Sequence, residues 1–236
     1  MLLEICVDTI KGARAACRGG AGRIELCSAL SEGGLTPSAG LMRAACDLPV
    51  PCYAMIRPRS GLFHFSTEDQ AIMLADIDAA RAAGLAGVVL GAQDPDGSLD
   101  LDLLGRLVDR SQGMGRTLHR VIDVVPDPYV ALDQAIALGF ERVLTSGTKP
   151  TAPEGVACIA EMVRRADGRI SVMPGCGITP ENVASVIGST GIQEVHAACS
   201  VPAQGDPAFS DFDPVGGRRE TSEHEVRAMV AAISAR

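Results

Sequence analysis

Short apolar runs alternate with longer amphipathic stretches along the whole chain. The short runs have the length of buried strands and occupy residues 2–8, 23–27, 52–57, 87–91, 117–121, 142–145, 170–173 and 193–196. Between and after them, stretches rich in alanine show helical spacing at residues 67–83, 101–110, 128–138, 152–165 and 222–233. Eight strand–helix units without a linker rich in proline or serine predict one (β/α)8 TIM-barrel domain over residues 1–236.

The main alternative to a barrel is a doubly wound open sheet. That fold binds its cofactor through a glycine-rich turn directly after the first strand. The corresponding segment here, residues 8–12, reads DTIKG and lacks this fingerprint. Glycines that end helical stretches, such as Gly84 and Gly139, instead agree with repeated strand–helix units. The sequence therefore favours the barrel.

Composition and charge exclude several classes of partner. The 236 residues include 21 Lys and Arg against 29 Asp and Glu, which gives a net charge of −8 that repels phosphate backbones. No apolar run reaches the 18 residues of a membrane span, and the acidic N-terminal segment does not resemble a secretory signal. The eight cysteines contain no C-x-x-C pair, so we expect reduced thiols. We therefore predict a cytoplasmic protein that contacts neither nucleic acid nor membrane.

Alternation along each predicted strand separates side chains that face the barrel lumen from those that face the helices. In the first run Leu3, Ile5 and Val7 form the apolar set, which leaves the alternate positions for the lumen. The inward set over all runs is Glu4, Cys6, Asp8, Arg23, Glu25, Cys27, Met55, Arg57, Thr117, His119, Glu194 and His196. Barrel interiors are usually filled by Val, Ile and Leu, so this polar lumen needs an explanation.

Two explanations of the polar lumen stay open at this point. Buried charges must be paired, so Glu4, Arg23 and Glu25 could form a structural ion-pair network. Groups at the carboxyl ends of the strands lie where barrel enzymes carry their chemistry. The catalytic candidates are Glu25, Arg57, His119, His196 and Asp8.

An anion site is a further expectation for the mouth of the barrel. Gly175 and Gly177 lie in the loop after the seventh run, where backbone N–H groups of many barrels bind phosphate. Arg57, at the end of the third run, could hold a carboxylate or phosphate with its planar fork. The alternative is that Arg57 only neutralises Glu25 or Asp8.

Several motifs closely resemble those of the CutC copper-homeostasis family. They are LEICVD at 3–8, GRIELCSALSEGGLTPS at 22–38, MIRPR at 55–59, HR at 119–120, ERVLTSG at 141–147 and EVH at 194–196. The resemblance spans nearly the whole chain. It departs from the family pattern at Cys176, where glycine is usual, and at Leu118, where phenylalanine is usual.

The resemblance implies a cytoplasmic barrel protein, usually a homo-oligomer, that is linked to copper tolerance and binds copper(I). The cysteines proposed as copper ligands in animal members of the family correspond to Cys6 and Cys27. Both lie late on neighbouring strands, which are about 4.8 Å apart, and copper(I) accepts low coordination by soft sulfur. Met55 on the next strand could add a thioether.

A second functional hypothesis keeps the same mouth but makes it an active site. In this interpretation the chain is a lyase or isomerase that acts on a small anionic metabolite. Arg57 would hold the anion, while His119 and a carboxylate, Glu25 or Asp8, would exchange protons. A Schiff-base mechanism is disfavoured because the only lysines, Lys11 and Lys149, lie outside the predicted strands.

Overall fold

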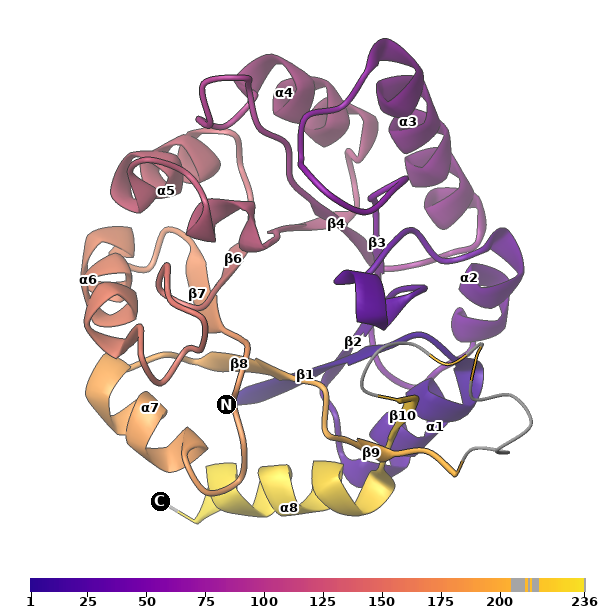
Figure 1. The fold of residues 1–236 in the computed structure, drawn as a ribbon, viewed down its shortest axis with the longest axis vertical. Coiled ribbons are helices and arrows are strands. Elements are labelled where there is room, and N and C mark those ends of the chain that lie inside the picture. The colour runs from indigo at the N-terminus through magenta and orange to yellow at the C-terminus, as the bar shows by residue number, and fades with distance from the viewer. Residues whose placement is uncertain (205–210, 212, 214–216, 236) are drawn as a thin grey trace.

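A ring of eight parallel strands lies at the centre of the structure, a computed structural model that describes residues 1–204, 211, 213 and 217–235 (Figure 1). The strand order is β7-β6-β5-β4-β3-β2-β1-β8. The strands are β1 (Leu2–Val7), β2 (Arg23–Leu26), β3 (Cys52–Met55), β4 (Gly87–Leu90), β5 (Gly115–Leu118), β6 (Arg142–Thr145), β7 (Ser171–Pro174) and β8 (Glu194–Ala197). This arrangement confirms the predicted (β/α)8 barrel.

Eight helices surround the ring (Figure 1). They are α1 (Ile10–Gly19), α2 (Ala39–Ala45), α3 (Thr67–Ala82), α4 (Leu101–Arg110), α5 (Pro128–Ala137), α6 (Val156–Ala166), α7 (Val183–Thr190) and α8 (Glu223–Ser234). Side chains that accept the first free N–H groups fix where several of them begin. Thr9 accepts from the Gly12 amide at the start of α1, and Ser66 and Asp69 form a capping box on α3.

The two faces of each strand carry the chemistry that the alternation predicts. Ile5, Ile24 and Leu26 are fully buried and belong to the apolar core. Glu4 and Arg23, which alternate with them, are also buried, but they contact charged groups inside the ring. The apolar set packs the barrel against its helices, so the lumen is left to polar side chains.

Two strands, β3 and β5, end two or three residues earlier than the sequence predicts. β5 stops at Leu118, and His119 then caps a short 3-10 helix, η2 (Arg120–Asp123), by accepting the Val121 amide proton at Nδ1. β3 stops at Met55, and the Arg57 amide donates to Thr36 Oγ1 at 2.9 Å. In both places a side-chain atom, rather than a neighbouring strand, accepts the backbone amide proton. The pattern of apolar residues does not reveal this hydrogen bond.

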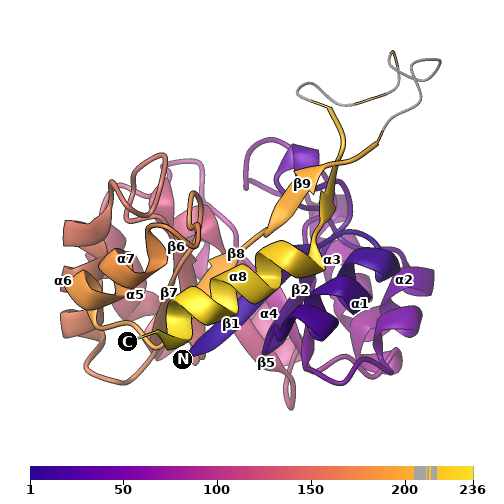
Figure 2. The ribbon, with the colours of Figure 1, turned by 90° about the horizontal axis from the view of Figure 1, so that it is seen from below.

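The loops that follow the carboxyl ends of the strands add two small elements to the mouth of the barrel. A second 3-10 helix, η1 (Leu30–Glu32), follows β2. A two-stranded hairpin, β9 (Ser200–Pro202) with β10 (Arg219–Thr221), follows β8 and projects beyond the helices (Figure 2). Among the described residues, every helix is too short or too polar to cross a membrane.

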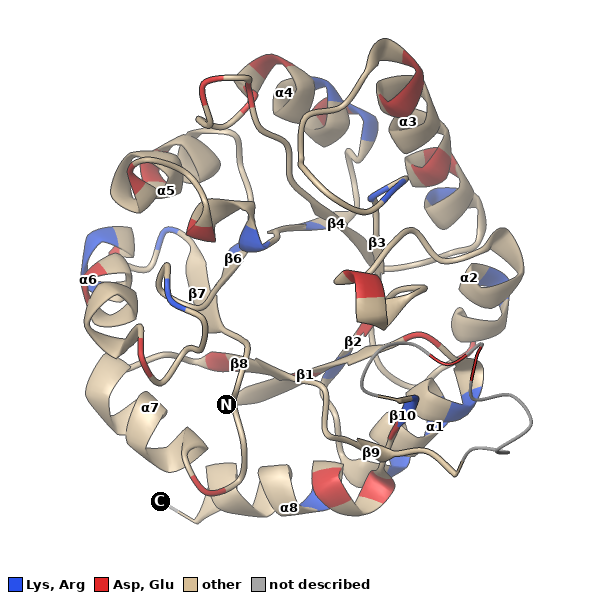
Figure 3. Cartoon of the chain, in the orientation of Figure 1, with Lys and Arg blue, Asp and Glu red and all other residues tan. Residues whose placement is uncertain are grey.

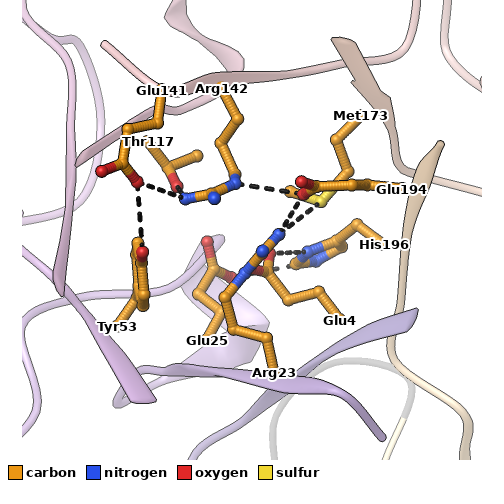
Figure 4. A network of polar contacts seen from close by, with 10 residues as sticks. All are labelled: Glu4, Arg23, Glu25, Tyr53, Thr117, Glu141, Arg142, Met173, Glu194 and His196. Atoms are coloured by element: carbon orange, nitrogen blue, oxygen red, sulfur yellow. Dashed lines mark hydrogen bonds and ion pairs between the residues drawn. The ribbon is translucent and has the colours of Figure 1, made fainter. Parts of the chain in front are cut away.

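Charged residues cover the outer helices and loops, but a smaller set lies on the ring of strands (Figure 3). Within the ring, Arg23 donates to both Glu4 and Glu194, and Arg142 donates to Glu194 at 3.1 Å (Figure 4). Both guanidinium groups lie over the Tyr53 ring, with Cζ 5.4 and 5.0 Å from its centroid. The network compensates charges that burial would otherwise make strongly unfavourable.

Replacement of Arg23 by methionine tests this network. The variant should lower the free energy of unfolding by roughly 3–5 kcal/mol, because the buried Glu4 and the partly buried Glu194 each lose one of their two cationic partners. The control is Arg110→Met, which breaks the exposed pair with Asp78 and should leave the stability almost unchanged. Denaturant unfolding measures both, and equal stability of the two variants would contradict a structural role for the network.

Candidate metal centre

Three side chains with metal-binding atoms converge inside the mouth of the barrel. Cys6 on β1 lies beside Glu25 on β2, because the register pairs these two residues. β8 pairs with β1 so that Glu4 lies beside His196. One ligand atom each from Cys6, Glu25 and His196 lies within 4.8 Å of the other two. This thiol–carboxylate–imidazole cluster comes from three strands that are neighbours in the ring.

Glu4 fixes the orientation of the His196 ring. His196 Nδ1 lies 2.8 Å from Glu4 Oε1, and Nε2 lies 3.8 Å from Glu25 Oε2 (Figure 4). Burial disfavours the charged carboxylate of Glu4, but the hydrogen bond and charge of His196, with help from Arg23, lower its pKa to about 2. A charged Glu4 that binds Nδ1–H directs Nε2 toward Cys6 and Glu25, as carboxylates do behind metal-bound histidines.

Charge in the cluster favours a cation at the Nε2 side of His196. Burial alone would lower the pKa of His196, but the Cys6, Glu25 and Glu4 groups raise it well above its usual value. Burial also raises the pKa of Glu25. The cluster therefore stabilises the protonated His196 ring, so a metal ion that binds Nε2 must displace a proton from this nitrogen.

Cys27 lies next to this cluster rather than within it. Its thiol donates to Glu25 Oε2, with a sulfur–oxygen distance of 3.6 Å. Burial, followed by the charges of Glu25 and Cys6, raises the pKa of Cys27 well above its usual value. Cys27 is fully buried, whereas Cys6 is half-buried. The register explains why Cys27 is outside the cluster, because Cys6 pairs with Glu25 and Cys27 follows the end of β2, two residues after Glu25.

A cavity of about 490 Å³ connects the cluster with the surface. Cys6 and His196 line its inner part, and Cys176 and Cys199 from the loops after β7 and β8 also line it. Arg120 holds the Cys176 side of the wall, since its Nη1 donates to Cys176 Sγ at 2.7 Å. Three thiols thus share one cavity. The sequence indicated Cys176 only as a departure from a family pattern and gave no role to Cys199.

The predicted anion-site residues do not meet in this cavity. Gly177 lines it, whereas Gly175 and Arg57 do not. The missing side chain of Gly175 allows Leu144 and His196 to pack closely against the backbone. A Cβ at this position would lie 2.6 Å from Leu144 Cδ1 and 3.3 Å from His196 Cδ2. Asp8 follows β1 in the turn to α1, and no hydrogen bond of its side chain to the cluster occurs among the described residues.

Arg57 is not an ion-pair partner of Glu25 or Asp8 in the described part of the chain. Its guanidinium donates to three backbone carbonyls, those of Glu32, Gly34 and Gly61. It thereby joins the loop after β2 to the loop after β3. The expectation of a simple neutralising pair is therefore wrong, because these loops place carbonyl oxygens closer to Arg57 than any carboxylate.

The loop after β6 also differs from a phosphate site. The Asp123 carboxylate accepts hydrogen bonds from the Ser146 and Thr148 amides, at 2.9 and 3.1 Å. It also binds the Arg120 side chain at 2.8 Å. A side-chain carboxylate thus occupies the amide groups that a phosphate would use, and the loop is held by contacts within the chain.

Fold and site together define a (β/α)8 barrel with a candidate soft-metal centre at its mouth, and comparisons with known proteins agree with this class. The CutC family model matches residues 1–201. "Family protein CutC" of Sinorhizobium medicae is 52% identical over 100% of this chain and 97% of its own length. The protein of the same name from Agrobacterium fabrum is 51% identical, over 100% of this chain and 95% of its own length.

A solved structure gives the same result. The crystal structure of a copper homeostasis protein CutC from Streptococcus agalactiae superposes with a TM-score of 0.80 and 30% sequence identity. The match covers 84% of this chain and 98% of the other chain. The chain belongs to the CutC family.

The pH dependence of stability tests whether His119, at the opposite side of the mouth, is buried and neutral. Burial, together with the nearby charge of Arg57, lowers the pKa of His119 to about 3. The unfolded chain binds a proton at this residue below about pH 6.5, while the folded chain does not, so stability must fall as the pH decreases. Between pH 6.5 and 5.5 the contribution of His119 to the unfolding free energy should fall by about 1 kcal/mol.

The variant His119→Asn keeps an acceptor for the Val121 amide but removes the titrating ring. Its unfolding free energy should therefore depend less steeply on pH between 6.5 and 4 than that of the wild type. Denaturant unfolding at a series of pH values measures the difference. Parallel pH profiles of the two proteins would contradict the buried neutral imidazole.

Proposed function

We propose that this protein acts in copper homeostasis and binds copper(I) in the mouth of its barrel. Cys6 Sγ and His196 Nε2 are the principal ligands, and Cys27 is an adjacent third. The observation that carries the proposal is the convergence of Cys6, Glu25 and His196 within 4.8 Å at the wall of a cavity. The name of the Streptococcus agalactiae relative supports the role in copper homeostasis, while the choice of ligands rests on the geometry of this chain.

The donor set agrees with the chemistry of copper(I). A thiolate and an imidazole are ligands that this ion accepts, and it tolerates low coordination numbers. A closed zinc site would use four ligands, usually cysteine and histidine. The Glu25 carboxylate is a harder ligand than a thiolate or an imidazole. We therefore assign Glu25 two other roles: it compensates the charge of the bound ion, and it accepts the proton that Cys27 releases when its sulfur binds copper(I).

Hydrogen bonds and an ion pair already hold the His196 ring in the orientation that copper(I) binding requires. Glu4 accepts from His196 Nδ1, and Arg23 holds Glu4 from the other side. Histidines that bind metals almost always donate their second ring N–H to such a partner. The ring is therefore oriented before copper(I) arrives, which lowers the ordering entropy that binding requires.

The proposed ligand chemistry also bears on location and assembly. The structure contains all eight cysteines as free thiols, and Cys6 must be reduced to bind copper(I). A reducing compartment such as the cytoplasm supplies that state. Assembly into a homo-oligomer stays a prediction from the family resemblance.

A second candidate function is an enzyme that acts on a small anion. One observation favours it: Arg57 and His119 each hold a buried N–H donor without a partner among the described residues. Neither residue is one of the proposed copper ligands. The two candidate functions therefore require different residues and can be tested separately.

The copper proposal predicts a graded response to substitution. Cys6→Ser and His196→Asn should each weaken copper(I) binding by more than the roughly 10- to 100-fold effect of losing an outer-shell partner. Cys27→Ser should weaken it less, because this thiol is protonated and bound to Glu25 before copper arrives. Anaerobic competition with a copper(I) chelator measures the affinities.

Matched controls exist among the other cysteines. Cys46 is exposed and Cys158 is half-buried, and both belong to the outer helical layer, so Cys46→Ser and Cys158→Ser should bind like the wild type. Unchanged affinity of the Cys6→Ser protein would overturn the proposed site. An effect of Cys27→Ser as large as that of Cys6→Ser, with none for His196→Asn, would replace it by a two-cysteine site.

A further inference from the structure

Two buried hydrogen-bond donors at the mouth of the barrel have no acceptor within the part of the chain that the structure describes. They are Arg57 Nε, after β3, and His119 Nε2, after β5. The two side chains are 7% and 3% exposed, so water has little access to either group. Buried polar groups are nearly always hydrogen-bonded, and each exception calls for a partner that the chain itself does not supply.

Hydrogen bonding fixes which ring nitrogen of His119 carries the proton. Nδ1 accepts the Val121 amide proton at 3.0 Å, so it must present a lone pair. Because burial and the Arg57 charge keep the ring neutral, its single proton lies on Nε2. His119 Nε2 is therefore a donor, and it needs an acceptor.

The guanidinium of Arg57 also lacks a carboxylate within salt-bridge distance among the described residues. No salt bridge joins its guanidinium to a carboxylate in the described part of the chain, and its hydrogen-bond partners are neutral carbonyls. Burial lowers the pKa of Arg57, which reflects the unfavourable loss of water around this charge. A bound water molecule would satisfy the free N–H group but would leave the charge uncompensated.

The surrounding residues hold the two groups in place. The Phe63 ring lies 5.0 Å from Arg57 Cζ and 4.7 Å from the centroid of the His119 ring. The His119 ring packs directly on Gly91, where a Cβ would lie 2.1 Å from His119 Cε1. Phe63 is half-buried in the loop of residues 58–66, so this ring lies between the two groups and the surface of the mouth only in part.

We propose that Arg57 and His119 form a binding site for a small oxyanion, a carboxylate or an inorganic phosphate. One oxygen of the ligand accepts from Arg57 Nε and from His119 Nε2, and its charge compensates the guanidinium. The site shares no residue with the copper ligands Cys6 and His196. It therefore stands or falls independently of the proposed copper function.

Nuclear magnetic resonance titration of the wild-type protein tests the site with both of its own side chains in place. The Arg57 Nε–H and His119 Nε2–H signals, assigned with the Arg57→Lys and His119→Asn proteins, are followed during titration with sodium phosphate, sodium acetate or sodium chloride. Phosphate or acetate should shift both signals downfield with one common saturation curve. If neither signal moves, or only one does, the proposal is wrong.

Binding affinities of variants provide the second measurement. Arg57→Lys and His119→Asn should each weaken binding of the preferred oxyanion roughly ten- to a hundredfold, as expected for one hydrogen bond to a charged group. Arg59→Lys and His64→Asn, in the same loop as Phe63, are matched controls and should bind like the wild type, as should Cys6→Ser. Phosphate and acetate distinguish the two ligand classes, and equally tight binding of chloride would contradict an oxyanion site.

Discussion

The rest of the lumen depends on the contacts that the buried Glu4 carboxylate makes with Arg23 and His196. This carboxylate is completely inaccessible to solvent, and it binds Arg23 on one side and His196 on the other. Through Arg23 it belongs to the ion-pair network that fills the barrel. Through His196 it orients the candidate metal centre. One residue on β1 thus connects the stability of the barrel with the geometry of its site.

The mouth of the barrel has an electrostatic polarity that follows from these contacts. On the side of β1, β2 and β8, the carboxylates of Glu4 and Glu25 stabilise positive charge at His196. On the side of β3 and β5, burial and the nearby charge of Arg57 keep His119 neutral, and two N–H donors have no acceptor among the described residues. A cation and an anion therefore find complementary surroundings on different sides of one opening.

The sequence alone predicts the fold and the facing of side chains well, because both follow from simple periodicity. Eight apolar runs identify the barrel, and alternation correctly places Glu4, Arg23 and Glu25 in the lumen. Family resemblance adds the membership that the comparisons confirm. The fold and the facing of the side chains are predictable because both depend on patterns within single strands.

Contacts between strands are what the sequence could not provide. Strand register places Cys6 beside Glu25 rather than beside Cys27, and no pattern within either strand encodes that register. The partners of Arg57 are backbone carbonyls of two loops, which carry no mark in the sequence. The role of Glu4 behind His196 likewise depends on the pairing of β1 with β8, at opposite ends of the chain.

The central claim is that copper(I) binds one sulfur and one imidazole nitrogen in the mouth of the barrel. X-ray absorption spectroscopy of the wild-type protein loaded anaerobically with one equivalent of copper(I) tests it most directly. The spectrum should require both sulfur and imidazole nitrogen in the first shell, and the nitrogen contribution should disappear in His196→Asn. A first shell of sulfur alone, unchanged in that variant, would contradict the account.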